Sequence, residues 1–490
     1  MAHKLADSVA REILRLHSDR TDVSEIAHRL NLKKVQVSSI IAHHQLSKGL
    51  RSLSIGGDSP MIDLEEDSKA ESHELSREEE LQRSELVEQY TASPEGSRKA
   101  DELVNEEQEL SQGGKGIFIG QDKEFNDSLY WNPEATAAVQ NPHMMIVGES
   151  GSGKTYAAQC LIAELAQREI PSVIFDYGQG FELDTLDPVV RKYVGIREYR
   201  LGEDGIALNP LQIFPKDIKG PASVATRLSD VFDAVYHLGH IQRKVLIEAI
   251  LSTFEKRGIS TEKASSWGNE APTFAQLQQT LDEWAADKQY ANAKNVLGLA
   301  ARLTTFFMLS SFGAADRPWS WEAIVTDTKH RVHILQFRGL EGKTQKVTLE
   351  VLLWHLFFYL KSHGQGQLRL YCILDEAHHL SFREGGPVDL LLREARKFGL
   401  GIIFASQQPE DFSEVAFSNT ASKLIFQTAD PSSKVSRYLA VKTTNYESPD
   451  EIHDIIAVQS RGDAFFITQN RGHKVHVADL GLRATQWKVV

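Results

Sequence analysis

The sequence predicts an α/β fold with a mostly parallel sheet, and three observations support this prediction. Eight short apolar runs, rich in β-branched or aromatic residues and bounded by turn residues, are typical of buried strands. They cover residues 116–120, 144–148, 172–177, 332–337, 371–376, 401–407, 423–428 and 464–469. Helical stretches lie between many of them, which favours parallel strands. Residues 221–312 have helical periodicity without strand signals and indicate a helical insertion.

These elements place the α/β domain at residues 115–490, and a chain of 490 residues allows further domains. Residues 1–50 fit two short helices broken around Asn31, with Asp22 as a plausible N-cap. This pattern resembles a helix-turn-helix whose second helix begins near Lys33. Such a helix contacts a DNA groove or phosphates, or the module packs against a partner protein or caps an oligomer.

Residues 51–114 form an acidic segment with few large apolar residues, which predicts a flexible linker. From Asp58 to Leu110 there are eighteen acidic and five basic residues, so this stretch carries the whole net charge of −13. It is either a solvated tether or a strand that competes with DNA for a basic pore. The rest of the chain is nearly neutral, which neither supports nor excludes contact with DNA.

Composition bounds the cellular setting. No apolar run approaches the roughly 20 residues that span a membrane, and the N-terminus lacks the apolar stretch of a signal peptide. We therefore expect a cytoplasmic protein without membrane contact. The two cysteines, Cys160 and Cys372, lie in stretches assigned to the core, where they are expected to be reduced apolar fillers.

A phosphate-binding loop follows the apolar run 144–147. The residues Gly148, Glu149, Ser150, Gly151, Ser152, Gly153, Lys154 and Thr155 match G-x-x-x-x-G-K-[ST], and a helical pattern begins with Tyr156. The glycines let backbone N–H groups point at phosphates, and the helix N-terminus adds positive potential. We predict that these residues and Tyr156 bind ATP, with Lys154 on the β- and γ-phosphates and the Thr155 hydroxyl on Mg²⁺.

Two carboxylates end the apolar run before residue 375. Asp375 is predicted to hold Mg²⁺, and Glu376 to polarise the attacking water. The alternative is that one or both cap the next helix. His378 and His379 follow, but adjacent histidines on a helix point in different directions, which argues against a metal site.

Polar residues at other strand ends extend this site. Gln407 ends a strand and is predicted to contact the γ-phosphate or the nucleophilic water. Arg393 and Arg396 lie in a basic helix, and either could reach a neighbouring subunit's nucleotide as an arginine finger or be a solvated surface charge. Asp176 could tune the water or metal, or hydrogen-bond the next turn.

The motifs NPHMMIVGESGSGKT, IFDYGQGFE, LNPL, ILDEAH, REARKFGLGIIFASQQP and RGDAFFI together resemble the HerA/FtsK superfamily of hexameric DNA-pumping ATPases. The resemblance spans residues 116–480. It is greatest to HerA-like helicases of bacterial antiphage defence, including those tied to DNA phosphorothioation or partnered with nuclease or NAD-consuming effectors. The DEAH sequence also suggests DEAH-box RNA helicases, but their other motifs are not found.

The resemblance implies a RecA-like core, a homo-hexameric ring with shared ATP sites, and a channel for duplex DNA. By position it assigns Lys154 and Thr155 to Walker A, Asp375 and Glu376 to Walker B, Gln407 to the sensor and Arg396 to the finger. HerA proteins commonly begin with a small β-barrel, which this N-terminus does not resemble. Three functions stay open: a DNA translocase or helicase, a non-translocating scaffold for an effector enzyme, and a conjugation or secretion ATPase.

Overall fold

The computed structural model describes residues 116–133, 141–287, 289–309, 312–313, 319–428, 433–446, 448–485 and 487. Residues from Gly116 onward form one unit of the chain. The predicted helix-turn-helix module at 1–50 and the acidic linker at 51–114 lie outside the described residues.

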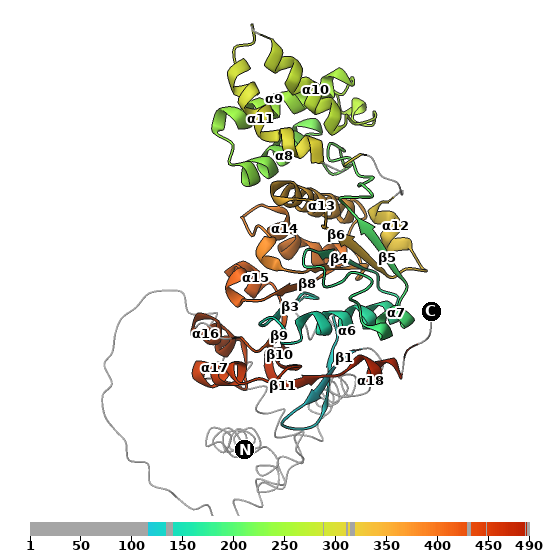
Figure 1. The fold of residues 1–490 in the computed structure, drawn as a ribbon, viewed down its shortest axis with the longest axis vertical. Helices are drawn as coiled ribbons and strands as arrows, with labels where there is room; N and C mark the ends of the chain where they lie inside the picture. The colour runs from blue at the N-terminus through green and yellow to red at the C-terminus, as the bar shows by residue number, and fades with distance from the viewer. Residues whose placement is uncertain are drawn as a thin grey trace, which may run out of the picture. The chain divides into compact units, whose positions relative to one another are not determined.

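One sheet of eleven strands organises the described part of this unit (Figure 1). Its strands are β1 (Ile117–Asp122), β2 (Ser128–Trp131), β3 (Met144–Val147), β4 (Ser172–Asp176), β5 (Ile196–Arg200), β6 (Val332–Gln336), β7 (Leu370–Leu374), β8 (Leu400–Ser406), β9 (Ser422–Phe426), β10 (Asp463–Thr468) and β11 (Arg471–Val477). Their order in the sheet is β2-β1-β11-β10-β9-β3-β8-β7-β4-β6-β5.

The seven strands from β9 to β5 are mutually parallel, and β10, β11, β1 and β2 add antiparallel strands at one side. This confirms the predicted α/β class with a mostly parallel sheet. Every residue of β3, β4, β7 and β8 is buried, as expected for parallel strands covered on both faces. The strand β3, which leads into the phosphate loop, lies in the middle of the sheet.

Helices cover both faces of the sheet, and the sheet separates two core clusters, one on each face. The helices of the sheet-covering part are α6 (Lys154–Gln167), α7 (Pro188–Tyr193), α12 (Trp321–Thr326), α13 (Gly342–Ser362), α14 (Pro387–Glu394), α15 (Glu414–Ser418), α16 (Ser433–Lys442), α17 (Pro449–Ala457) and α18 (Leu480–Ala484), with the short 3₁₀ turns η2 (Ala377–His379), η3 (Ala395–Phe398) and η4 (Pro409–Asp411). One cluster joins α6 and α7 to the sheet, and the other contains α13, α14 and the helices described next.

A helical layer lies beyond α13 (Figure 1). It consists of α8 (Pro221–Tyr236), α9 (His240–Lys256), α10 (Phe274–Ala286) and α11 (Ala293–Leu309), with the turn η1 (Ala264–Ser266). Phe232 of α8 meets Phe306 of α11 edge to face, with ring centroids 5.0 Å apart. Both rings belong to the same core cluster as the sheet residues under α13. The helical layer therefore packs directly on the part of the unit that contains the sheet.

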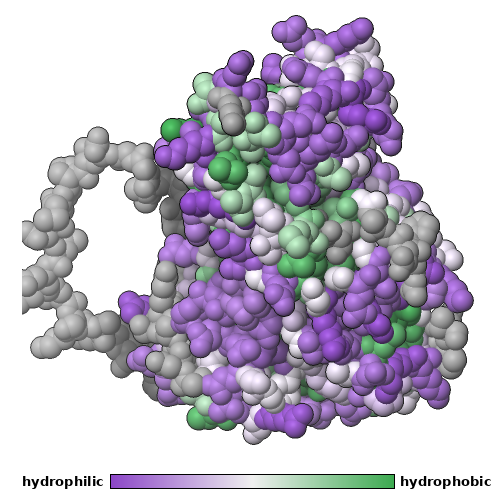
Figure 2. Space-filling view, turned by 45° about the horizontal axis from the view of Figure 1, so that its top comes forward, coloured by the Kyte–Doolittle hydropathy of each residue, from purple (hydrophilic) through white to green (hydrophobic). Residues whose placement is uncertain are grey.

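The surface of the unit is mostly hydrophilic, and Figure 2 shows hydrophobic surface gathered in patches on one face. Large apolar side chains that are exposed include Ile241, Leu297 and Met308 of the helical layer. In the described part of the chain, none of the helices has the length and apolar character needed to cross a membrane.

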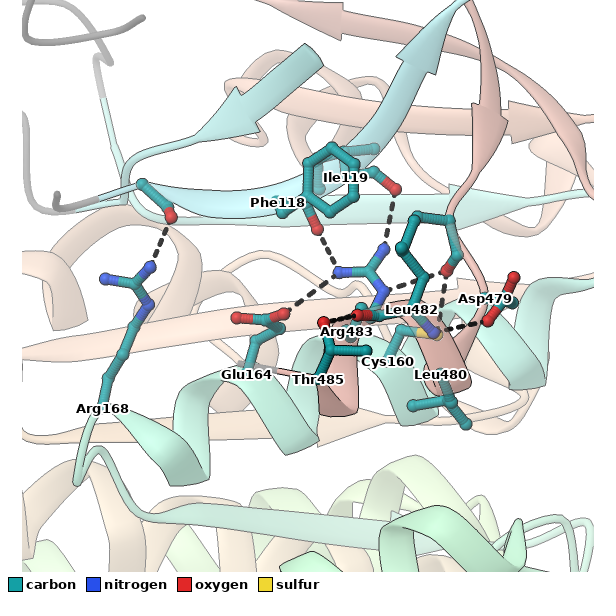
Figure 3. Close-up of polar contacts among 12 residues, drawn as sticks. Phe118, Ile119, Cys160, Glu164, Arg168, Asp479, Leu480, Leu482, Arg483 and Thr485 are labelled. Atoms are coloured by element: carbon teal, nitrogen blue, oxygen red, sulfur yellow. Dashed lines mark hydrogen bonds and ion pairs between the residues drawn. The ribbon is translucent and has the colours of Figure 1, made fainter. Parts of the chain in front are cut away.

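A buried arginine fastens a C-terminal segment to the sheet and to α6 (Figure 3). The Arg483 guanidinium is 3% exposed and donates to the carbonyls of Ala478, Phe118 and Ile119. Its Nη1 also lies 3.5 Å from Glu164 Oε1 on α6. A buried guanidinium with this many acceptors is well satisfied, so it ties three separate segments together.

The same segment, residues 478–483 and here called the C-terminal latch, contacts α6 at three successive turns. Tyr156, Cys160 and Glu164 are spaced four residues apart and so lie on one face of that helix. The Leu480 N–H donates to the Tyr156 hydroxyl at 2.7 Å, and Cys160 Sγ lies 3.8 Å from the Ala478 carbonyl. The latch thus holds the helix that begins at Lys154.

Candidate functional site

The loop between β3 and α6 has the backbone of a phosphate cradle. Gly148, Gly151 and Gly153 have φ of 157°, 81° and 122°, and the last two lie in the region that glycine adopts without strain. A Cβ on Gly148 would lie 2.5 Å from Phe426 Cβ and 2.8 Å from Ser152 Oγ, so a side chain does not fit there. Successive N–H groups of such a loop, with the N-terminus of α6, are suited to phosphate oxygens.

Lys154 is the first residue of α6, and its Nζ donates to the Glu149 carbonyl at 2.9 Å. Burial lowers the pKa of Lys154, whereas the negative charges of Glu376 and Asp375 act in the opposite direction. Ser152 Oγ is buried and makes no hydrogen bond with a described residue. The cradle therefore combines a cation with an unused hydroxyl, a donor set that fits the phosphates of ATP.

Asp375 lies at the end of β7, which is separated from β3 by β8 alone. Burial, together with the charges of Glu376 and Asp176, raises the pKa of Asp375 to about 7. A Cβ placed on Gly180 would be 3.8 Å from Asp375 Oδ2 and 3.9 Å from Thr155 Oγ1, so these two oxygens flank one point. A hydroxyl and a carboxylate are ligands that Mg²⁺ uses alongside phosphates and water, so the residues present fit that ion.

Glu376 directly follows Asp375 and turns the chain sharply. Its φ of 50° is in the left-handed region, which is uncommon for a residue with a side chain. Its Oε1 accepts a hydrogen bond from Gln407 Nε2 at 3.4 Å. Its Oε2 is buried and has no hydrogen bond with a described residue, although His378 Nδ1 lies 3.2 Å away. One carboxylate oxygen thus accepts a hydrogen bond from Gln407, and the other faces His378.

Asp176, at the end of β4, makes structural contacts. Its Oδ2 accepts hydrogen bonds from Gln336 Nε2 at 2.7 Å and from the Phe181 N–H at 3.0 Å. Burial raises the pKa of Asp176, and those two hydrogen bonds oppose the shift. The contacts hold the turn 177–180, whose glycines approach Thr155, Asp375 and Glu376. Sequence reasoning did not single out Gln336, although a polar residue at the end of an apolar strand is the same signal that marked Gln407.

Arg393 and Arg396 lie at the other end of the strands. Both precede β8, whereas the phosphate loop follows the parallel strand β3. A strand of the length of β8 spans about 20 Å, so the two arginines are not brought to the phosphate loop of their own chain. Arg393 Nε donates to Asp389 Oδ1 at 2.6 Å. Arg396 is close enough to His143, which precedes β3, to influence its pKa.

The remaining predicted nucleotide residues lie on or beside the loop. Ser150 is exposed, and the Glu149 N–H donates to the Gln427 carbonyl at 2.8 Å. The Tyr156 hydroxyl is turned toward Leu480 in the C-terminal latch. Among the described residues there is no group of three or more His, Cys, Asp or Glu side chains arranged as a metal site. A magnesium ion held by one carboxylate, one hydroxyl and phosphates does not require such a group.

Comparison with known proteins relates this domain to a family. Residues 137–356 match the family model described as the central domain of helicase HerA. The match supports a P-loop ATPase of the HerA/FtsK type. The match to the HerA model covers the phosphate loop, the strands β3, β4 and β6 and the helical layer.

Two relatives extend the comparison. The DNA double-strand break repair helicase HerA of Sulfurisphaera tokodaii is 22% identical over 350 residues, which are 66% of this chain. This chain spans 62% of the length of that HerA relative. The structure of VirB4 of Thermoanaerobacter pseudethanolicus aligns with a TM-score of 0.58 at 15% identity, covering 74% of this chain and 96% of VirB4. That likeness concerns the fold, which this HerA-type domain shares.

Proposed function

We propose that this chain hydrolyses ATP with Mg²⁺ at the loop Gly148–Thr155 and uses the energy to move along or open duplex DNA. The observation that carries the proposal is that five predicted residues from three segments meet at the carboxyl ends of the parallel strands. Lys154 and Thr155 follow β3, Asp375 and Glu376 follow β7, and Gln407 follows β8, although these segments are far apart in sequence. The HerA match supports the same activity.

The chemistry follows from the contacts. Lys154 and the loop N–H groups bind the phosphates and stabilise the charge that develops during phosphoryl transfer. Thr155 and Asp375 would hold Mg²⁺, which would neutralise phosphate charge. Glu376 orients the attacking water and takes its proton, while the hydrogen bond from Gln407 to Oε1 holds the carboxylate. Gln407 thereby couples the end of β8 to the presence of nucleotide.

We further propose that the active species is a homo-oligomeric ring, most simply a hexamer. Arg393 and Arg396 lie at the sheet edge opposite to the phosphate loop, so either arginine serves a nucleotide only if that nucleotide belongs to another copy. An arginine supplied by a neighbour stabilises the transition state in many P-loop enzymes. Arg396 is the first candidate, because the resemblance to the HerA/FtsK motifs places the finger at this position of the sequence.

A second candidate function is a non-translocating ring that assembles and regulates a partner enzyme, a nuclease or an NAD-consuming effector, in bacterial antiphage defence. Residues 1–136, which include the acidic segment, precede the HerA match. In this proposal they bind the partner enzyme. The conjugation or secretion alternative receives no argument from the VirB4 likeness, which concerns the fold. Co-purification with a partner enzyme, without duplex movement, distinguishes the scaffold from the motor.

The direct test measures ATP hydrolysis with and without duplex DNA. Lys154→Ala is expected to lose ATP binding, whereas Glu376→Gln is expected to bind ATP and to hydrolyse it at least about 100-fold more slowly. Lys244→Ala, at a largely exposed lysine, is the control and keeps normal turnover. If the wild-type rate of ATP hydrolysis is the same with and without duplex DNA, and no duplex is moved, the proposed motor function is contradicted. Unchanged turnover in Glu376→Gln would contradict the assigned base.

A further inference from the structure

Four aromatic rings form a column along the carboxyl ends of the strands, where the candidate site lies. Phe337 follows β6, Tyr177 follows β4, and His379 and His378 lie in η2 after β7. The order β7-β4-β6 makes these three strands neighbours. The rings of Tyr177 and Phe337 are stacked with centroids 4.4 Å apart, and those of Tyr177 and His379 with centroids 4.7 Å apart. The column ends at His378, whose ring centroid lies 4.2 Å from that of His379.

The column is fixed at one end and open at the other. Phe337 is fully buried in the larger core cluster, whereas the His378 side chain is 44% exposed. Aromatic rings at these spacings attract one another in addition to burying surface. His378 is therefore held by packing on one side, while a little under half of its side-chain surface stays exposed.

The open end of the column lies against Glu376. The left-handed backbone of Glu376, with the hydrogen bond from the His379 N–H to the Glu376 carbonyl at 2.9 Å, folds η2 back toward the Glu376 side chain. This turn places His378 Nδ1 3.2 Å from Glu376 Oε2. Gln407 contacts the other oxygen. The carboxylate thus lies between two nitrogen-bearing side chains that come from different segments.

We propose that His378 is a positioning residue for Glu376, and that the stacked rings of His379, Tyr177 and Phe337 hold it there. The proposal rests on the proposed role of Glu376 in ATP hydrolysis. Glu376 can rotate about its own side-chain bonds, and a misplacement of about 1 Å at a reacting group can cost about 100-fold in rate. A neighbour on each oxygen restricts that rotation before nucleotide arrives.

Two substitutions separate the nitrogen of His378 from its ring. His378→Phe keeps a ring that stacks on His379 but removes the nitrogen, and His378→Asn keeps a nitrogen at similar reach but removes the ring. Because the side chain is half exposed, both variants are expected to fold, which thermal unfolding checks. His363→Phe is the matched control: its Nε2 lies 3.2 Å from Glu322 Oε2 and its side chain is 40% exposed, but it lies at the end of α13.

The expected result is a split between turnover and binding. His378→Phe lowers kcat for ATP about tenfold with KM and ATP affinity within about twofold of wild type, and His378→Asn recovers most of the loss. His363→Phe matches wild type. Wild-type kcat in His378→Phe, or an equal loss in both His378 variants, overturns the positioning role. Glu376→Gln is measured beside them: if it alone abolishes turnover, the positioning role fails while the proposed function stands, and if it hydrolyses normally, the proposed function itself fails.

Discussion

At the scale of single residues, His143 shows how the sheet constrains ionisation at the end of β3 opposite to the phosphate loop. It is fully buried just before β3, and its Nδ1 accepts a hydrogen bond from the Ile402 N–H of β8 at 3.1 Å. Burial, followed by the positive charge of Arg396, lowers the pKa of His143 to about 3. The ring is neutral in the folded protein near neutral pH, while the unfolded chain titrates near its ordinary pKa of about 6.5.

This difference predicts a loss of stability in acid. Because the folded pKa is the lower one, the contribution is complete above pH 6.5 and is lost as the pH falls from there toward 3. His143→Asn keeps an acceptor for the Ile402 N–H and has no proton to gain. The stability difference between wild type and variant should shrink by about 2 kcal/mol between pH 7.5 and pH 5, measured by urea unfolding. A difference independent of pH would contradict the buried neutral ring.

Part of the candidate site could be predicted from the sequence alone. Lys154 and Asp375 were predictable because the chemistry of a phosphate loop and of a strand-end carboxylate is carried by local spacing. The contact of Gln336 with Asp176 was not, since it depends on β6 lying beside β4 across 160 residues of sequence. The side-chain neighbours of Glu376 likewise depend on the left-handed turn that follows it.

At the scale of elements, burial explains which strands the sequence predicts. The parallel strands β3, β4, β7 and β8 are buried along their length, so each is an uninterrupted apolar run. The strand β5, with the sequence IREYR, lies at the edge of the sheet and is largely exposed, and the strand β11 also carries several polar residues. The residue patterns of β5 and β11 cannot be told from those of loops, because their strand structure depends on pairing with a neighbouring strand.

The C-terminal latch gives a prediction at this scale. Arg483→Met removes the donors to three carbonyls and the cation that pairs with the buried Glu164, which should cost about 3–5 kcal/mol of unfolding free energy. Glu164→Gln should cost less, because Arg483 keeps its backbone acceptors. In a double-mutant cycle the combined variant should lose less than the sum of the two single losses. Additive losses would contradict a shared buried pair.

At the scale of the whole molecule, the sheet separates two groups that the proposed reaction needs together. Lys154 lies after β3, and Arg396 lies before β8, with the length of the strands between them. If Arg396 completes the site of a neighbour, each active site consists of parts of two copies. Activity then belongs to an interface rather than to a chain.

Mixing two inactive variants tests this arrangement. Lys154→Ala and Arg396→Ala are each expected to be inactive, but their mixture should regain part of the ATP hydrolysis, because an intact loop can meet an intact arginine. The control mixture, Lys154→Ala with Glu376→Gln, should stay inactive, since both changes damage the same half of the site and every chain carries one. A first mixture as inactive as its components would contradict a finger at Arg396.

The C-terminal latch also affects the order in which this domain is completed during synthesis. Glu164 leaves the ribosome 319 residues before Arg483, the cation that it requires. Domains generally fold as units while translation proceeds, and contacts of such long sequence separation form late. The phosphate-binding loop is therefore synthesised early, whereas the contacts of the C-terminal latch with α6 form only after residues 478–483 have been synthesised. A nascent chain that has not yet reached the latch therefore carries the motif on a helix that still lacks these contacts.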